Sequence, residues 1–138
     1  MALQFSAEVR NARLDAIETI GGAAPMLELR SGAVPANCAA ASTGALLTRD
    51  ALPSDWLGAA VAGVKSKAGT WTLTGLAGIT TSNIGHFRIF KAGSPDDCIL
   101  QGTVTATAGG GDMTVDNISL AATQVVTVTS FAITDGNA

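Results

Sequence analysis

The fold class is decided by three stretches in the second half of the chain: Thr70-Trp71-Thr72-Leu73-Thr74, Val104-Thr105-Ala106-Thr107 and Val126-Thr127-Val128-Thr129. In each stretch, threonine alternates with an apolar residue. Successive side chains of a β-strand point to opposite faces, so this alternation predicts strands with one buried face and one wet face. Threonine suits the wet face because it is β-branched and carries a hydroxyl group without a charge.

Other segments also predict strands, with turn residues between them. Met26-Leu27-Glu28-Leu29-Arg30 alternates after Pro25, with its leucines on one face and its charged residues on the other. Gly109-Gly110-Gly111-Asp112 is predicted to be a hairpin connection. The remaining strand candidates are residues 45–48, 69–76, 85–91, 98–108, 112–115 and 123–134. This order predicts a mainly β fold, an antiparallel, jelly-roll-like β-sandwich with one N-terminal α-helix.

The helix is predicted over residues 6–22. Ser6 suits the N-cap position, and Glu8 lies in the first turn, where the helix dipole favours an acid. Gly21 and Gly22 are expected to end the helix, because glycine enters the left-handed C-cap conformation without strain. A helix this short is marginal in water and must dock on another element. The helical stripe that is expected to dock consists of Val9, Ala12, Arg13, Ala16, Ile17 and Ile20.

The length and the charge content describe the whole molecule. The 138 residues suit a single domain over residues 1–138, with the helix followed by the sandwich over residues 26–134. Only 14% of the residues are charged, whereas the surface of a small soluble protein is typically about 25–35% charged. We therefore expect a surface that is rich in hydroxyl and amide groups and is covered in large part by neighbouring subunits.

Charge and hydropathy exclude two classes of partner. The formal net charge is −3, so the basic footprint of a nucleic-acid-binding protein is missing. No apolar run approaches the ~20 residues that a membrane helix needs. Lys65-Ser66-Lys67 is expected to be a flexible loop, too small for a nucleic-acid patch. The first residues lack a basic segment and Glu8 interrupts any apolar run, so we expect no export signal and synthesis in a cytoplasm.

The sequence offers few residues for catalysis or metal binding. His86 is the only histidine and has no nucleophile motif beside it, so a structural or interface role is expected. The glycines at residues 109–111 lack the following helix of a phosphate-binding loop. The most clustered acids of the second half are Asp96, Asp97, Asp112 and Asp116. They are expected to be solvated turn residues rather than Ca²⁺ ligands. No enzymatic activity, metal or cofactor is predicted.

The two cysteines, Cys38 and Cys98, are too few for a disulfide scaffold. With only His86 as a further soft ligand, they do not indicate a zinc site. Two reduced thiols are expected in a cytoplasmic product. A Cys38–Cys98 bond would close a long loop, which the chain-entropy model values at about 4 kcal/mol. Such a bond matters only for a protein that leaves the reducing compartment.

A longer pattern runs through nearly the whole chain. It comprises Phe5-Ser6, residues 9–18, residues 27–38, Leu52-Pro53-Ser54-Asp55-Trp56, Gly85-His86-Phe87-Arg88-Ile89-Phe90, Gly102-Thr103-Val104, Gly110-Gly111-Asp112-Met113 and Asp116-Asn117. This pattern resembles a family of small structural proteins that are encoded among the virion genes of tailed bacteriophages and prophages. The resemblance implies a virion component without chemistry of its own. It does not cover residues 77–83.

The residues and the resemblance together predict a non-enzymatic virion structural protein, present in many copies at the neck, the collar or the capsid surface. It is expected to pack against copies of itself and against capsid, portal, neck or tail proteins, with no nucleic-acid or membrane partner. The expected contact residues are Val9, Arg10, Arg13, Ile17 and Trp56. Because virions end in oxidising surroundings, a Cys38–Cys98 bond, or one between subunits, becomes plausible after lysis.

The alternative function is a tail- or fibre-associated module that binds a host glycan. Exposed Trp56 and Trp71, together with turn acids, would form its sugar platform. An aromatic content of 4% without any tyrosine weighs against this alternative. A polysaccharide hydrolase that uses two of the clustered acids is a third and less favoured function.

Overall fold

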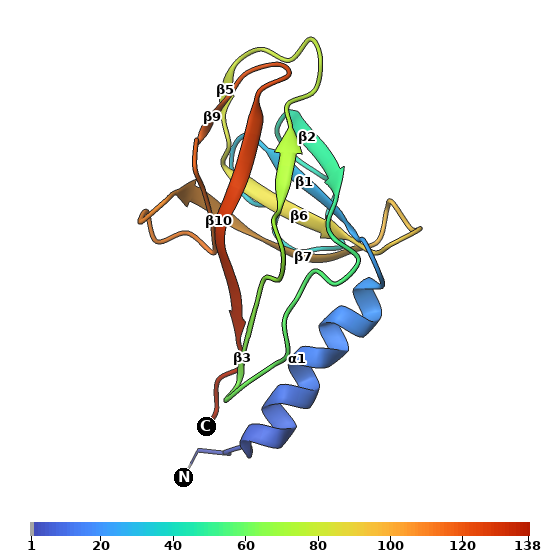
Figure 1. The fold of residues 1–138 in the computed structure, drawn as a ribbon, viewed down its shortest axis with the longest axis vertical. Coiled ribbons are helices and arrows are strands. Elements are labelled where there is room, and N and C mark those ends of the chain that lie inside the picture. Colours follow the sequence, from blue (N-terminus) through green and yellow to red (C-terminus); the bar gives the residue numbers. More distant parts are fainter. Residues whose placement is uncertain (1) are drawn as a thin grey trace.

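The computed structural model describes residues 2–138, which form one helix and ten strands (Figure 1). The elements are α1 (Ala7–Gly21), β1 (Met26–Arg30), β2 (Leu46–Ala51), β3 (Val64–Ser66), β4 (Thr72–Thr74), β5 (Ser82–Asn83), β6 (His86–Phe90), β7 (Cys98–Ala106), β8 (Met113–Val115), β9 (Ser119–Leu120) and β10 (Val125–Thr134). The fold is mainly β and sandwich-like with one N-terminal helix, so the predicted fold class is confirmed. The strands β3, β5 and β9 were not predicted.

Eight of the strands form one strongly curved sheet in the order β2-β1-β6-β7-β8-β10-β3, with β4 also paired to β10. Figure 1 shows β10 crossing the direction of β6 and β7, so that two layers enclose the core. The ends of the sheet meet where β2 approaches β4. There the Leu76 amide donates to the Leu47 carbonyl at 2.9 Å, and the Thr48 hydroxyl donates to the Thr74 carbonyl at 2.7 Å. We call this contact between β2 and β4 the seam.

An aromatic chain runs through the core. The ring of Trp71 lies 6.2 Å from that of Trp56 and 5.4 Å from that of Phe131, and Phe131 meets Phe87 edge to face at 5.5 Å. Both indole N–H groups are satisfied, by the Gly22 carbonyl at 3.2 Å for Trp56 and by the Ala68 carbonyl for Trp71. Centroid distances of this size are those of favourable aromatic pairs. The aromatic chain therefore joins both layers of the sandwich.

The limits of α1 agree with the prediction. The Ser6 side chain accepts a hydrogen bond from the Val9 amide, and Gly22, with φ +76°, caps the C-terminus. At Gly21 a Cβ atom would lie 2.8 Å from Cζ2 of Trp56, so glycine lets the helix end approach the core closely. These local signals fix the helix at both ends.

The predicted docking stripe of α1 is largely wrong. Leu14 is the buried apolar residue of the helix, and Ile17 packs at the edge of the core, whereas Val9 and Ile20 are 44% and 56% exposed. Polar contacts determine this orientation. Arg10 donates to the carbonyls of Ala62 and Asp135, Asn11 accepts from the Gly63 amide, and Asp15 and Glu18 pair with Lys65.

Lys65 lies in β3 and not in the flexible loop predicted for residues 65–67. It is 2% exposed, and its Nζ lies 2.8 Å from the carboxylate of Asp15 and 2.9 Å from that of Glu18. Burial lowers the pKa of Lys65, but the hydrogen bonds and charges of the two acids outweigh it and raise this pKa above 10.5. A buried ammonium group is tolerated because both acids compensate its charge.

The predicted hairpin at residues 109–112 is also wrong. The strands that flank it, β7 and β8, pair in parallel, with Val104 beside Met113 and Ala106 beside Val115. The connection folds back over β7, where the Asp112 carboxylate accepts from the amide and the hydroxyl of Thr103 at 2.8 Å each. A Cβ atom at residue 109 or 111 would lie 2.7 or 2.9 Å from Thr105, so the glycines permit this close return.

Candidate functional site

The structure divides the expected contact residues. The Val9 side chain is exposed, and Arg13 is 53% exposed while it pairs with Asp135 at 3.2 Å. Arg10 and Ile17 are half-buried in contacts within the chain. Trp56 is 0% exposed, so its place among the contact residues is corrected to the core.

A narrow part of the exposed side of α1 is apolar, although Arg13 and Asp15 are exposed beside it. Val9, Ala12, Ala16 and Ile20 are all exposed and lie at spacings of three or four residues, which places them on one side of the helix. We call these four residues the α1 stripe. All four residues belong to the helical stripe that the sequence predicted to dock on the sheet. The stripe was recognised, but it faces outward instead of inward. An exposed apolar stripe on a helix is typical of a surface that contacts another chain.

The other residues singled out in the sequence have structural positions. Asp112 and Asp116 accept backbone hydrogen bonds from Thr103 and Thr127, so they organise turns. His86 is fully buried, and its Nδ1 lies 3.0 Å from the Gly32 carbonyl oxygen. Within residues 2–138, no group of three or more His, Cys, Asp and Glu side chains is arranged to hold a metal ion. None of the helices in this part of the chain is long and apolar enough to span a membrane.

The proposed sugar platform is not on the surface. Trp56 and Trp71 are 0% and 1% exposed and pack against each other. Stacking of a sugar requires an accessible aromatic face. The glycan-binding alternative therefore loses the two side chains on which it was based.

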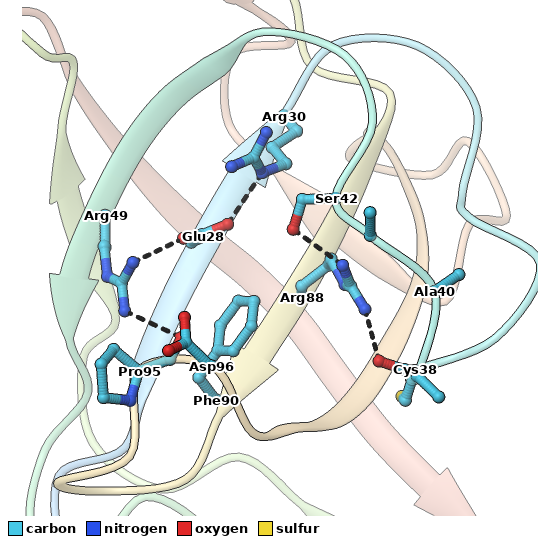
Figure 2. Close-up of a pocket in the computed structure, with 12 residues that line it drawn as sticks. Glu28, Arg30, Cys38, Ala40, Ser42, Arg49, Arg88, Phe90, Pro95 and Asp96 are labelled. Carbon is cyan, nitrogen blue, oxygen red and sulfur yellow. Dashed lines mark hydrogen bonds and ion pairs between the residues drawn. The ribbon is translucent and has the colours of Figure 1, made fainter.

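A polar pocket that the sequence analysis did not predict lies on the outer face of β1, β2 and β6 (Figure 2). Its volume is about 320 Å³. The sheet register places Arg49 beside Glu28, and Glu28 beside Arg88. The lining residues are Glu28, Arg30, Cys38, Ala39, Ala40, Ala41, Ser42, Arg49, Arg88, Phe90, Pro95 and Asp96. We call this cavity the arginine pocket.

Glu28 is the central acid of the arginine pocket. It is 2% exposed, and its two carboxylate oxygens accept from Nε of Arg30 at 2.8 Å and from Nη1 of Arg49 at 2.9 Å. Arg30 also donates to the Gly44 carbonyl, and Arg49 to the Pro95 carbonyl. Charge-assisted bonds of this length are among the stronger hydrogen bonds in proteins. Glu28 thus orients two arginines that also hold neighbouring loops.

Arg88 has a different environment. It is 2% exposed and donates to the Ser42 hydroxyl and to the Cys38 carbonyl, both at 2.7 Å. Its guanidinium lies 5.5 Å from the ring centroid of Phe90. Across the part of the chain that the structure describes, no carboxylate pairs with Arg88, and its buried Nε has no hydrogen-bond partner. The charge of Arg88 is therefore buried without a salt bridge among residues 2–138, although Glu28 is its neighbour in the sheet register.

The two cysteines meet at the edge of the arginine pocket. The Cys98 thiol donates to the Leu100 carbonyl at 3.3 Å, and it lies near enough to Cys38 to affect the pKa of that thiol. Burial, followed by the neighbouring Cys98 thiol, raises the pKa of Cys38 to about 11, although Arg88 acts in the opposite direction. Both cysteines are free and half-buried. The structure thus brings together the pair considered for a disulfide.

Sequence signals for the arginine pocket were present but incomplete. The alternation in residues 26–30 placed Glu28 and Arg30 on one face of their strand. Arg88 and Phe90 are two residues apart in the strand candidate 85–91, so they share a face as well. Nothing local showed that these faces are neighbours, because the register joins three segments that are distant in sequence. Comparison of the chain with protein-family models, with curated proteins and with solved structures finds no match.

Proposed function

We propose that this chain is a non-enzymatic structural protein of a tailed-bacteriophage virion. It is a multi-copy accessory component of the neck, the collar or the capsid surface, and it packs against copies of itself and against other virion proteins. The observation that carries the assembly part of this proposal is the exposed α1 stripe. The virion part rests on the family resemblance of the sequence.

The orientation of α1 supports a contact with another chain. A helix on the surface of a monomer normally turns its apolar side inward. Here Leu14 faces the sheet together with charged and polar residues, while Val9 and Ile20 face outward. Burial of an apolar surface in an interface contributes about 25 cal/mol per Å² before the costs of association. Docking of the α1 stripe on another subunit therefore stabilises an assembly.

The composition of the surface supports the same function. The chain contains eight Lys and Arg residues and eleven Asp and Glu residues, and several of these are used internally. Glu28, Lys65 and Arg88 are each 2% exposed. Because only 14% of the residues are charged, the density of charge at the surface is low. A surface of this kind favours packing in a regular, multi-copy array.

Sedimentation equilibrium tests the assembly. We expect the wild-type protein to self-associate, and the double variant Val9→Glu/Ile20→Glu to be monomeric with an unchanged circular dichroism spectrum. The matched control is Leu76→Glu/Val125→Glu, which changes two exposed apolar residues outside α1 and is expected to associate like the wild type. A wild-type protein that stays monomeric at millimolar concentration, or equal loss of association in both variants, contradicts a role of the α1 stripe.

Mass spectrometry of purified phage particles tests the virion location. We expect peptides of this chain in the particles, with a copy number that is a multiple of the symmetry of the neck or the capsid. Infected-cell lysate that has been cleared of particles serves as the control. Presence of the protein only in the cleared lysate contradicts the virion role, even if the protein self-associates.

A further inference from the structure

We propose that the arginine pocket binds a small oxyanion, a carboxylate or a phosphate group, with Arg88, Arg49 and Arg30 as its cationic wall (Figure 2). This site is independent of the α1 stripe, and its ligand does not depend on the assembly proposed above. The proposal rests on the charge of the pocket, on the environment of Arg88 and on the volume and lining of the cavity.

Positive charge is concentrated in the pocket of an otherwise acidic chain. The pocket contains three of the five arginines, although the formal net charge of the chain is −3. Its acids are Glu28 and Asp96, so the lining carries one positive charge in excess. Both carboxylate oxygens of Glu28 are occupied by Arg30 and Arg49. The Glu28 carboxylate is therefore directed at Arg30 and Arg49 and forms no salt bridge with Arg88.

Arg88 is a buried cation that has no salt-bridge partner within residues 2–138. Arginine remains charged at any pH that proteins tolerate, and burial of an unpaired charge is costly. Ser42 and the Cys38 carbonyl each accept one N–H of Arg88, so each Nη atom retains a second N–H. A carboxylate or phosphate group complements such a guanidinium because it accepts parallel, charge-assisted hydrogen bonds. An oxyanion in the pocket would supply the missing charge.

The size and the lining of the pocket suit a small ligand. Its volume of about 320 Å³ lies at the lower end of the range for small-molecule sites. Ala39, Ala40 and Ala41 form one side and leave space in front of the arginines, because their side chains are single methyl groups. Arg49 and Arg30 are more accessible than Arg88, with side chains that are 29% and 15% exposed. They form the entrance, and Arg88 forms the inner wall.

Thermal unfolding with added anions tests the site. The probes are inorganic phosphate and glucuronate, with glucose as the neutral counterpart of glucuronate and sodium chloride to match the ionic strength. A ligand that binds only the folded state raises Tm as its concentration rises past its Kd. We expect a saturable rise in Tm with at least one of the two anions and none with glucose. Response to phosphate alone assigns a phosphate ligand, and response to glucuronate alone assigns a carboxylate.

Variants locate the effect. Arg49→Gln keeps the hydrogen bonds of Arg88, and we expect it to raise the Kd for the anion at least tenfold. Arg88→Met is expected to abolish anion binding. If this variant fails to fold, the Kd of Arg49→Gln tests the proposal instead. The matched control is Arg13→Gln, which removes a guanidinium from the exposed side of α1 and should leave the Kd unchanged. A rise in Tm that follows only ionic strength, or is equal in all variants, overturns the proposal.

Discussion

At the scale of single residues, Lys65 and Gly21 show how α1 is held. Lys65 is a buried ammonium group between two acids of the helix, and Gly21 lets the helix end touch Trp56. The sequence alone does not predict that either residue is part of the core. Both roles depend on close approach of a helix to a sheet, which leaves no local signal. Each contact leads to a prediction about stability.

The first prediction concerns the pH dependence of stability. Folding raises the pKa of Lys65 above 10.5, because the pairing with Asp15 and Glu18 outweighs the burial. A base whose pKa is raised by folding stabilises the folded state fully below its unfolded pKa. We therefore expect this contribution to be complete at neutral pH and to be lost as the pH rises from about 10.5 through the pKa of the folded state. Urea unfolding between pH 7 and 12 measures it.

Two variants isolate the pair. Lys65→Met removes the titrating amine, so the variant should not lose this contribution at alkaline pH. The difference in the free energy of unfolding between wild type and variant should therefore shrink as the pH rises. Asp15→Asn/Glu18→Gln leaves the buried ammonium group without compensation and should cost about 3 kcal/mol at pH 7. Lys91→Met is the control, because Lys91 is exposed. A constant difference between wild type and Lys65→Met across this pH range contradicts the prediction.

The second prediction concerns Gly21→Ala. Alanine is the better helix former by about 1 kcal/mol. At this position its Cβ would lie 2.8 Å from Trp56 and 2.9 Å from Ile99, so packing strain should exceed that gain. We expect a net loss of about 1–3 kcal/mol in the free energy of unfolding. Gly58→Ala, where the nearest atom lies at 3.6 Å, is the control and should change stability by less than half as much.

At the scale of elements, the ends of α1 were predictable and its orientation was not. Ser6 and Gly22 act within one turn of the helix, so the sequence alone places both caps. The orientation depends on Lys65 and Asp135, which are more than forty residues away from the helix. Short strands were missed for a related reason. Two or three residues, as in β5, carry no alternation to detect.

The arginine pocket shows the same limit on prediction. The pattern in residues 26–30 correctly separated the two leucines of the core from a face with charged residues, whereas Ala106, predicted on a buried face, is exposed. The pairing of β1 with β2 and β6 then placed Glu28 between Arg49 and Arg88. A single sequence does not contain this register. The parallel pairing of β7 with β8 was hidden in the same way, because glycine-rich turns suggest hairpins.

The third prediction concerns the loop that carries Cys38. Because Cys98 in β7 is near enough to affect the pKa of Cys38, we expect an intramolecular disulfide when the protein is treated with oxidised glutathione. Two thiols lose two protons and two electrons, and the glutathione disulfide is reduced to two thiols. The raised pKa of Cys38, about 11, keeps the thiolate scarce at neutral pH, so oxidation should accelerate as the pH rises. Intact mass should fall by two hydrogens.

The cross-link should also change stability. Closure of a loop of this length adds about 4 kcal/mol in the chain-entropy model, measured as the difference in urea unfolding with and without reductant. Cys98→Ser should remove both the mass change and the gain. Oxidation that yields only disulfide-linked dimers on non-reducing electrophoresis would contradict the intramolecular pair.

At the scale of the whole molecule, two surfaces with different chemistry lie on one scaffold. The α1 stripe is apolar and belongs to the helix, whereas the arginine pocket is polar and belongs to β1, β2 and β6. Variants of one surface should leave the other intact, because they share no residue. Assembly and anion binding are therefore separable by mutation. This independence keeps the tests of the two proposals distinct.

The seam between β2 and β4 determines how the molecule opens. Elsewhere in the curved sheet, backbone ladders join neighbouring strands. At the seam, the Leu76 amide donates to the Leu47 carbonyl, and the Thr74 amide donates to the Asp50 carboxylate. Local opening follows the line with the fewest cooperative bonds. In hydrogen–deuterium exchange, the amides of Thr74 and Leu76 should therefore lose protection at least tenfold faster than that of Ile89 in central β6. Equal exchange rates for these amides would mean that the seam, like the rest of the sheet, opens only when the entire protein unfolds.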